Sequence, residues 1–331
     1  MPSINPQFLD CVIYIYKNKK DALDGESAGG SGFLVHVPFE NNKPFGVIYA
    51  VTNNHVINKC LETVAIRLNT VDGVADVVET NPNDWKRHSS GADIRAIPIK
   101  LDFTQHKYIS VPKKFLLSLE IATLLEITPG HDVFMVGRFI NKEGKQKNTP
   151  SVRFGSIAMM PHEPIEDGYG IKQESFLVEC RSIPGFSGSP VFVRLDEHNP
   201  FRLRQFDYKR FVELTDMPPI GPWLLGVDWC HLPSYEPICD VQGDRKTKRY
   251  DMVAQSNTSM AGVIPAWLLI ELLDDEEFMA ERKEEADRFT RLKESSVVAE
   301  DVAGVKEQAE FTRDDFEDAL KKASRRKHSS E

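Results

Sequence analysis

Three side chains of this 331-residue sequence could together form an activated nucleophile: Ser187, His55 and Asp93. A serine hydroxyl is a poor nucleophile until an adjacent imidazole takes its proton, and the imidazole needs a carboxylate to fix its tautomer. Ser187 lies in a Gly/Ser/Pro-rich turn at 185–190. Gly185 permits a backbone conformation closed to other residues, which would let its N–H and that of Ser187 point into one concavity. We therefore expect an oxyanion hole beside this serine.

The order of the three residues along the chain favours one fold. They run His, Asp, Ser, as in chymotrypsin-type triads, whereas subtilisins and α/β-hydrolases order the same groups differently. Asp93 follows His55 by 38 residues and precedes Ser187 by 94. These intervals leave room for the later strands of one β-barrel and most of a second.

Several segments together resemble the trypsin-like serine peptidases, and most closely their Deg-type (high-temperature-requirement) branch. They are 30–35, 52–56, 93–94, 184–190, 224–227 and 261–266. The resemblance spans roughly residues 8–273 and implies that Ser187 is the nucleophile, His55 the general base and acid, and Asp93 the orienting carboxylate. It also implies that the Gly185 and Ser187 amides form the oxyanion hole of a serine endopeptidase working through an acyl-enzyme.

Other residues compete for these roles. Ser189 lies where the family usually has a second glycine, which favours a packing role. Asp76, Asp84 and Asp102 could face the histidine, but only Asp93 heads an apolar run in the Asp-Ile context of the family.

The substrate pocket has two candidate residues. By resemblance, Arg181 lies near the base of the pocket for the side chain before the scissile bond, where a bidentate ion pair would favour acidic substrates. The alternative is that Arg181 pairs with Asp228 or faces solvent, and we favour this alternative.

The resemblance implies an all-β fold of two six-stranded antiparallel β-barrels, followed by a C-terminal helix and a charged tail. Short β-branched or aromatic runs between turns predict strands at 11–16, 32–37, 46–52, 63–68, 93–101, 132–136, 176–180, 191–193 and 224–229. We expect one peptidase domain at 1–273, divided into a first barrel at about 8–111, an apolar connector at 112–127, a second barrel at about 128–264 and a helix from 266. An insertion at 194–222 and a polar loop at 231–258 are both expected to border the cleft, where they could gate it.

The tail at 274–331 carries 18 acidic and 12 basic residues, a net −6 of the chain's −9. Such a segment buries too little apolar surface to fold independently, so we expect it to be helical or partly disordered. A narrow apolar stripe of Phe316, Ala319, Leu320 and Ala323 could dock on the core or on an activating protein partner, or belong to a solvated helix.

Several classes of protein have little support. No His-Glu-x-x-His or Cys-x-x-Cys spacing suggests a metal, and the chain offers no cofactor motif. One short basic cluster in an acidic protein does not predict nucleic-acid binding, and no run reaches the ~20 apolar residues of a membrane span. Five cysteines, an odd number, imply no disulfide framework, and we expect a cytoplasmic setting. We expect a protein or peptide substrate. The alternative function is a latent or inactive trypsin-like scaffold that acts as a protein-binding module.

Overall fold

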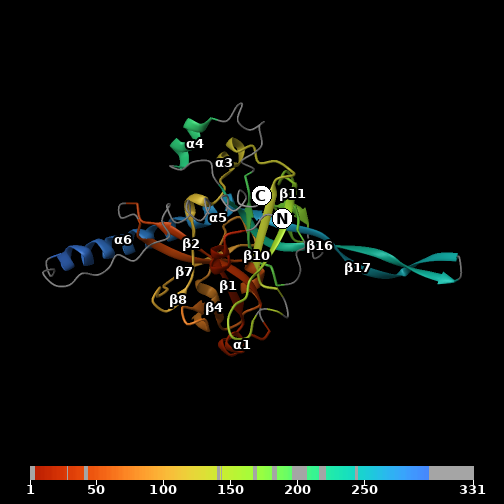
Figure 1. Ribbon diagram of the computed structural model, residues 1–331, viewed down its shortest axis with the longest axis horizontal. Coiled ribbons are helices and arrows are strands. Elements are labelled where there is room, and N and C mark those ends of the chain that lie inside the picture. Colours follow the sequence, from red (N-terminus) through yellow and green to blue (C-terminus); the bar gives the residue numbers. More distant parts are fainter. Residues whose placement is uncertain are drawn as a thin grey trace, which may run out of the picture.

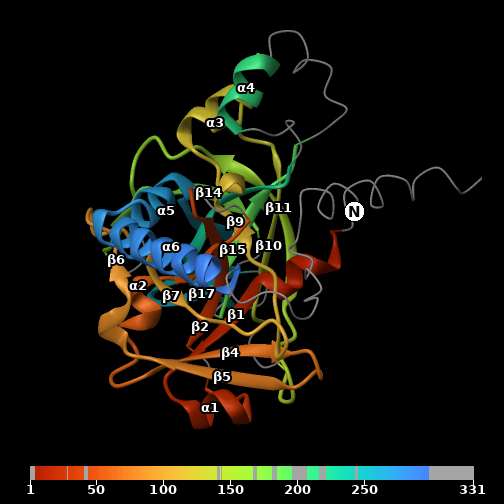
Figure 2. The same cartoon turned by 90° about the vertical axis from the view of Figure 1, so that its left-hand side faces the viewer.

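The computed structural model describes residues 4–27, 29–40, 44–139, 142, 144–166, 170–180, 185–195, 207–215, 221–242 and 245–297. Two β-sheets form the body of the protein (Figure 1), and α5 and α6 lie along one side of it (Figure 2). The apolar stripe at Phe316 and the rest of the tail beyond Val297 lie outside the described residues, as does Arg181.

The first sheet is open, with the strand order β5-β4-β1-β2-β3-β7-β6. Its strands are β1 (Val12–Tyr16), β2 (Gly30–Pro38), β3 (Gly46–Thr52), β4 (Val64–Thr70), β5 (Ala75–Thr80), β6 (Lys86–Arg87) and β7 (Arg95–Ile99). Two further short strands join it, β8 (His106–Lys107) on β4 and β9 (Val111–Pro112) parallel to β2. All five residues of β1 are buried, since this strand lies between β2 and β4 and is apolar or aromatic on both faces.

The second sheet is a closed barrel in the order β10-β11-β14-β17-β16-β15. Its strands are β10 (Asp132–Gly137), β11 (Ser151–Met159), β14 (Phe176–Glu179), β15 (Pro190–Val193), β16 (Trp223–Gln242) and β17 (Arg245–Pro265). A separate two-stranded hairpin, β12 (Ile165–Glu166) and β13 (Lys172–Gln173), lies between β11 and β14 in the sequence.

The predicted six-stranded closed barrel is therefore confirmed for the second sheet and is wrong for the first. The first sheet has nine strands, and its end strands β5 and β6 do not pair with each other. β6 has only two residues, which offer too few backbone groups to close a barrel. The fold is mostly β and chymotrypsin-like, with one closed barrel and one curled open sheet.

Short helices connect these strands. They are the 3-10 helices η1 (Pro6–Cys11), η2 (Pro82–Asp84) and η3 (Lys113–Phe115), and the α-helices α1 (Lys19–Asp24), α2 (Asn54–Ile57), α3 (Leu119–Leu124) and α4 (Tyr208–Thr215). η3 and α3 lie in the connector between the sheets, where Leu116 and Leu117 are buried and the Leu117 N–H donates to the Leu224 carbonyl of the second barrel. One hydrophobic core runs through both sheets and this connector.

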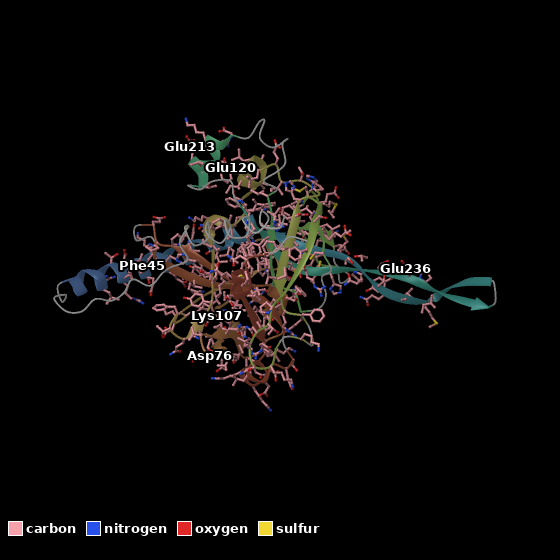
Figure 3. The ribbon with its side chains drawn as sticks, viewed as in Figure 1. Phe45, Asp76, Lys107, Glu120, Glu213 and Glu236 are labelled. Carbon is pink, nitrogen blue, oxygen red and sulfur yellow. The ribbon has the colours of Figure 1, made fainter. Side chains whose placement is uncertain are left out.

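The insertion at 231–258 is not a loop, because β16 and β17 continue through it as a long two-stranded ribbon. The ribbon extends from the barrel on the side opposite α6 (Figure 1), and Glu236 projects from it (Figure 3). Tyr235 pairs with Gln255 and Pro237 with Val253 along it, and the Tyr235 and Val253 side chains are exposed. Backbone pairing thus organises a segment whose polar composition suggested a loop.

Two consecutive helices end the described chain, α5 (Ala266–Leu273) and α6 (Glu276–Val297). Phe278 of α6 is buried against the ring of Tyr49 on β3, with ring centroids 4.9 Å apart. Arg282 donates to the Tyr49 hydroxyl at 3.1 Å, and Lys86 on β6 forms ion pairs with Asp275 and Glu277. The first turns of α6 are therefore fixed on the first sheet. No helix among the described residues has the length and hydropathy needed to cross a membrane.

Candidate active site

His55 and Asp93 form a two-point contact. The Nδ1 atom of His55 lies 2.6 Å from Oδ2 of Asp93, and the His55 backbone N–H donates to Oδ1 at 2.8 Å. An ionised carboxylate only accepts hydrogen bonds, so Nδ1 carries the proton and the lone pair of the neutral ring is on Nε2. This is the tautomer that a general base needs, and the His55 side chain is 29% exposed and open to a substrate.

Local packing explains why these two residues meet. β3 ends at Thr52 and α2 begins at Asn54, so His55 lies on a single helical turn beside the start of β7. The Asn53 side-chain amide and the Asn54 backbone N–H both donate to the Asp93 carbonyl, at 2.9 and 3.2 Å. The backbone of Asp93 is thereby tied to the turn that carries His55.

Arg95 forms hydrogen bonds at both ends of α2, and the sequence did not predict this role. Its Nε donates to the Asn54 side chain at 2.7 Å and its Nη2 donates to the Asn58 side chain at 2.9 Å. Desolvation by burial lowers the pKa of the Arg95 guanidinium to about 10. The group is charged at neutral pH, and these charge-assisted hydrogen bonds position both ends of the single-turn helix α2.

The competing carboxylates lie elsewhere. Asp76 contacts Nε2 of His106 at 3.0 Å, and Asp102 accepts hydrogen bonds from the Thr104 hydroxyl and amide. The hydrogen bond to His106 is the main reason that the pKa of Asp76 is lowered. Asp84 ends η2 on the surface. Of the four candidates, Asp93 is the one that the structure brings to His55.

The turn with Ser187 is fastened to β2 through Ser31. The Ser31 N–H donates to the Ser187 carbonyl at 2.9 Å, and the Ser31 hydroxyl donates to the Gly185 carbonyl at 2.8 Å. Gly185 and Gly188 have φ values of 103° and 88°, in the left-handed region that favours glycine. In the sequence, the segment around Ser31 was only one of those that carry the family resemblance. The structure shows in addition that Ser31 holds the Ser187 turn through two hydrogen bonds.

Two amides beside Ser187 are available to a ligand. Within the part of the chain that the structure describes, the N–H groups of Gly185 and Ser187 donate to no protein acceptor. Exposed N–H groups at such a turn can stabilise negative charge on an oxygen, which is the chemistry of an oxyanion hole.

The two halves of the site converge at Gly30. A Cβ built on Gly30 would lie 2.8 Å from Cγ2 of Val56 and 3.0 Å from the Ser187 carbonyl oxygen. The helical turn with His55 and the turn with Ser187 therefore border the same point. Among the described residues, however, no hydrogen bond joins the Ser187 hydroxyl to His55.

Ser189 and Asp228 are buried behind the turn. The Ser189 hydroxyl contacts no hydrogen-bond partner among the described atoms, and its side chain fills the space above Gly137. The Gly188 N–H donates to the Asp228 carbonyl at 2.8 Å, and the Asp228 N–H donates to the Ser189 carbonyl at 2.9 Å. Burial, reinforced by the charge of Asp228, raises the pKa of the Cys180 thiol to about 12.

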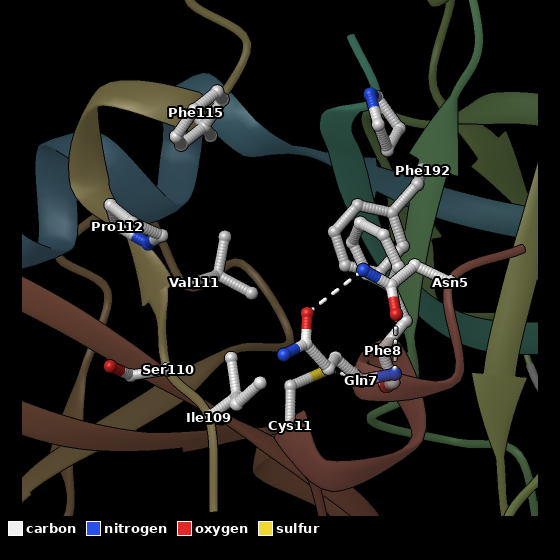
Figure 4. A pocket seen from close by; sticks show the side chains of 11 residues that line it. Asn5, Gln7, Phe8, Cys11, Ile109, Ser110, Val111, Pro112, Phe115 and Phe192 are labelled. Atoms are coloured by element: carbon white, nitrogen blue, oxygen red, sulfur yellow. Dashed lines mark hydrogen bonds between the residues drawn. The ribbon is translucent and has the colours of Figure 1, made fainter. Parts of the chain in front are cut away.

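An apolar pocket lies at a different place. It has a volume of about 30 Å³ and lies between η1, the connector and β15, lined among others by Phe8, Cys11, Val111 and Phe192 (Figure 4). None of the three triad candidates lines it. A search of the described residues for groups of His, Cys, Asp and Glu able to hold a metal ion found none.

Several solved structures are similar to this chain. The chain is similar to the MamO protease domain from Magnetospirillum magneticum (apo form), with 14% identity, a TM-score of 0.47, and coverage of 82% of this chain and 99% of that one. It is similar to Deg5 at 16% identity and a TM-score of 0.40, covering 68% of this chain and 81% of that one. It is also similar to the HtrA-type protease AlgW with a decapeptide, at 12% identity and a TM-score of 0.42, covering 82% and 66%.

These TM-scores lie below 0.5 and support no statement beyond the likeness itself. Comparison with curated protein sequences gave no match. A family model described as a trypsin-like peptidase domain matches residues 30–197, which are just over half of the chain and include His55, Asp93 and Ser187. The chain belongs to the trypsin-like peptidase domain family.

Proposed function

We propose that this protein is a serine endopeptidase that cleaves peptide bonds through an acyl-enzyme. The observation that carries the proposal is the two-point contact of Asp93 with His55, which leaves Nε2 of His55 as the ring nitrogen that can act as a base. In the proposed reaction the Ser187 hydroxyl attacks the carbonyl carbon of the substrate while Nε2 takes its proton. The Gly185 and Ser187 amides stabilise the oxyanion, and protonated His55 then gives the proton to the leaving amine.

Water completes the proposed cycle. It attacks the acyl-enzyme with His55 again as the base, which releases the new carboxyl end and restores the Ser187 hydroxyl. Asp93 stays ionised throughout and stabilises the imidazolium that forms in each half-reaction.

Labelling with a fluorophosphonate probe tests the proposal without a known substrate. Labelling of wild-type protein at Ser187, located by peptide mapping and lost in Ser187→Ala, is the expected result. On a cleaved substrate, Ser187→Ala should lower turnover by ~10⁶-fold, leaving a ~10³-fold residual over the uncatalysed rate. A Ser187→Ala protein that keeps near-wild-type activity would overturn the assignment.

A second candidate function is a latent trypsin-like scaffold that binds proteins. The observation that favours it is the lack of a hydrogen bond from the Ser187 hydroxyl to His55 in the described part of the chain. Catalytic hydrogen bonds are often long before substrate binds, so this geometry is also compatible with an active enzyme. Absence of labelling in a folded wild-type protein, followed by labelling after addition of a partner, would favour latency.

The cellular setting belongs to the same proposal. We infer a cytoplasmic enzyme with a protein or peptide substrate, because Cys11, Cys60, Cys180 and Cys230 are all free thiols. An activating partner that binds the C-terminal tail is the corresponding proposal for regulation. Deleting 298–331 and comparing the labelling rate with that of the full chain tests it, and an unchanged rate in cell extract would contradict it.

A further inference from the structure

One buried side chain of the second half of the protein reaches the backbone of Asp93 in the first half. Gln173, at the end of β13, is 6% exposed, and its Oε1 accepts a hydrogen bond from the Asp93 backbone N–H at 2.9 Å. The other polar groups of Asp93 contact the turn around His55: both carboxylate oxygens bond to His55, and the carbonyl accepts from Asn53. The Gln173 contact is thus the one that ties Asp93 to the second half.

We propose that Gln173 is a positioning residue for Asp93, and that residues 173–175 couple the catalytic carboxylate to the nucleophile turn. The inference rests on the serine peptidase function proposed above. It assigns no contact with substrate to Gln173. Its role is to fix the place of Asp93, and through Asp93 the ring of His55.

The connection continues from Gln173 toward Ser187. The Ser175 hydroxyl donates to the Gln173 carbonyl at 3.1 Å and accepts from Nε1 of Trp229 at 2.8 Å. Trp229 directly follows Asp228, whose backbone exchanges hydrogen bonds with Gly188 and Ser189. Ser175 and Trp229 are both buried, so water does not compete for these bonds. An unbroken series of buried contacts therefore joins the two ends of the candidate triad.

Helix α5 supports this series from outside. Nε1 of Trp267 donates to the Glu174 carboxylate at 3.0 Å, and the Trp267 ring packs edge-on against Phe176. Nε2 of His88, five residues before Asp93 in the chain, lies 3.3 Å from the carboxylate of Glu271, also on α5. Helix α5 thus contacts both the segment with Gln173 and the segment that precedes Asp93.

Substitutions of Gln173 test the hydrogen bond that its Oε1 accepts from the Asp93 N–H. In Gln173→Met the side chain keeps its approximate length but cannot accept strongly, so the buried Asp93 N–H loses its partner and the carboxylate moves. Because a displacement near 1 Å at a catalytic group can lower the rate ~10²-fold, we expect kcat to fall about 10- to 100-fold with KM unchanged. In Gln173→Glu an acceptor oxygen is kept and a negative charge is added near His55. We therefore expect most of kcat to return, with the acid limb of the pH profile displaced to higher pH.

The matched control is Asn69→Leu. Asn69 Oδ1 accepts from the Asn148 backbone N–H at 2.7 Å, which is the same kind of bond far from the triad candidates in the described chain. Both variants should lower the urea midpoint, but only Gln173→Met should lower kcat. If Gln173→Met and Asn69→Leu have the same kcat as wild type, Gln173 is a structural residue and the proposal is wrong.

A measurement that needs no turnover separates this inference from the proposed function. The His55 Nδ1 proton shared with Asp93 gives a strongly deshielded proton resonance, identified by its loss in His55→Ala. We expect this resonance to shift or broaden in Gln173→Met and to be unchanged in Asn69→Leu. An unchanged resonance in Gln173→Met would overturn the positioning role. If wild-type protein is not labelled at Ser187, the peptidase proposal fails while the resonance still decides the role of Gln173.

Discussion

Replacement of Gly188 by alanine should both slow the chemistry of the turn that carries Ser187 and destabilise the fold. Gly188 has a φ of 88°, and a Cβ built on it would lie 2.1 Å from the Ser31 carbonyl oxygen, although Cβ atoms essentially never come closer than 3.0 Å to another heavy atom. The turn or β2 must therefore move by about 0.9 Å to admit the methyl group. The same Ser31 fastens the Ser187 carbonyl, so this movement falls on the nucleophile.

The two expected effects can be measured separately. A positive φ costs about 1–2 kcal/mol for an alanine, part of which is offset by the lower entropy of the unfolded chain. Overpacking adds about 1–3 kcal/mol, so we expect Gly188→Ala to lower the free energy of unfolding by about 3 kcal/mol in all. A displacement of nearly 1 Å should lower the rate of fluorophosphonate labelling at Ser187 by about 100-fold.

Gly73→Ala is the control that separates these effects. Gly73 has a φ of 80° in the turn between β4 and β5, and a Cβ built on it meets nothing within 4 Å. Gly73→Ala should therefore lower the free energy of unfolding by about 1 kcal/mol and leave the rate of labelling at Ser187 unchanged. Urea unfolding gives the stabilities, and labelling is measured where both variants are folded. If Gly188→Ala is labelled at Ser187 at the same rate as wild type, the close packing of this turn on β2 does not have the inferred role.

Two further predictions concern α6 and a buried thiol. Phe278→Ala removes a ring that is 3% exposed and packed on Tyr49. It should lower the free energy of unfolding by about 3–5 kcal/mol and speed proteolysis within α6. A change in the free energy of unfolding below about 1 kcal/mol would contradict the docking of α6. Burial raises the pKa of the Cys11 thiol from 9.0 to about 12, so the unfolded chain ionises first and stability falls as pH rises through this interval. Between about pH 8 and about pH 10, urea unfolding should show that the free energy of unfolding falls by about 1.4 kcal/mol more in wild type than in Cys11→Ala. Equal losses in the two proteins would contradict the shift.

Strands with buried faces could be predicted from the sequence, and strands without them could not. The run at 46–52 matches β3 residue for residue because four of its seven residues are buried and apolar or β-branched. β11 was missed: only one of its nine residues is fully buried, and Gly155 interrupts it where the Glu179 carbonyl approaches the backbone. The ribbon of β16 and β17 was missed for the related reason that a two-stranded ribbon has no buried face to impose apolar alternation.

The same difference explains what the sequence revealed of the site. His55, Asp93 and Ser187 carry rare chemistry in a recognisable order, so three positions could be named before their geometry was known. Gln173, Arg95 and Ser31 are common polar residues, and nothing in their local sequence distinguishes them from surface positions. Their importance arises from contacts between segments far apart in the chain: Gln173 is 80 residues from Asp93, and Ser31 is 154 residues from Gly185.

These distant contacts also bear on whether the site is active as it stands. His55 is fixed by Asp93 and Asn54 by Arg95. The Ser187 turn is fixed by Ser31, which lies on β2 of the first sheet. The hydrogen bond from the Ser187 hydroxyl to His55 is not formed among the described residues. The activity of the proposed peptidase should therefore depend not only on the triad residues themselves but also on the contacts between the two sheets that position them, among them the Gln173 bond to Asp93.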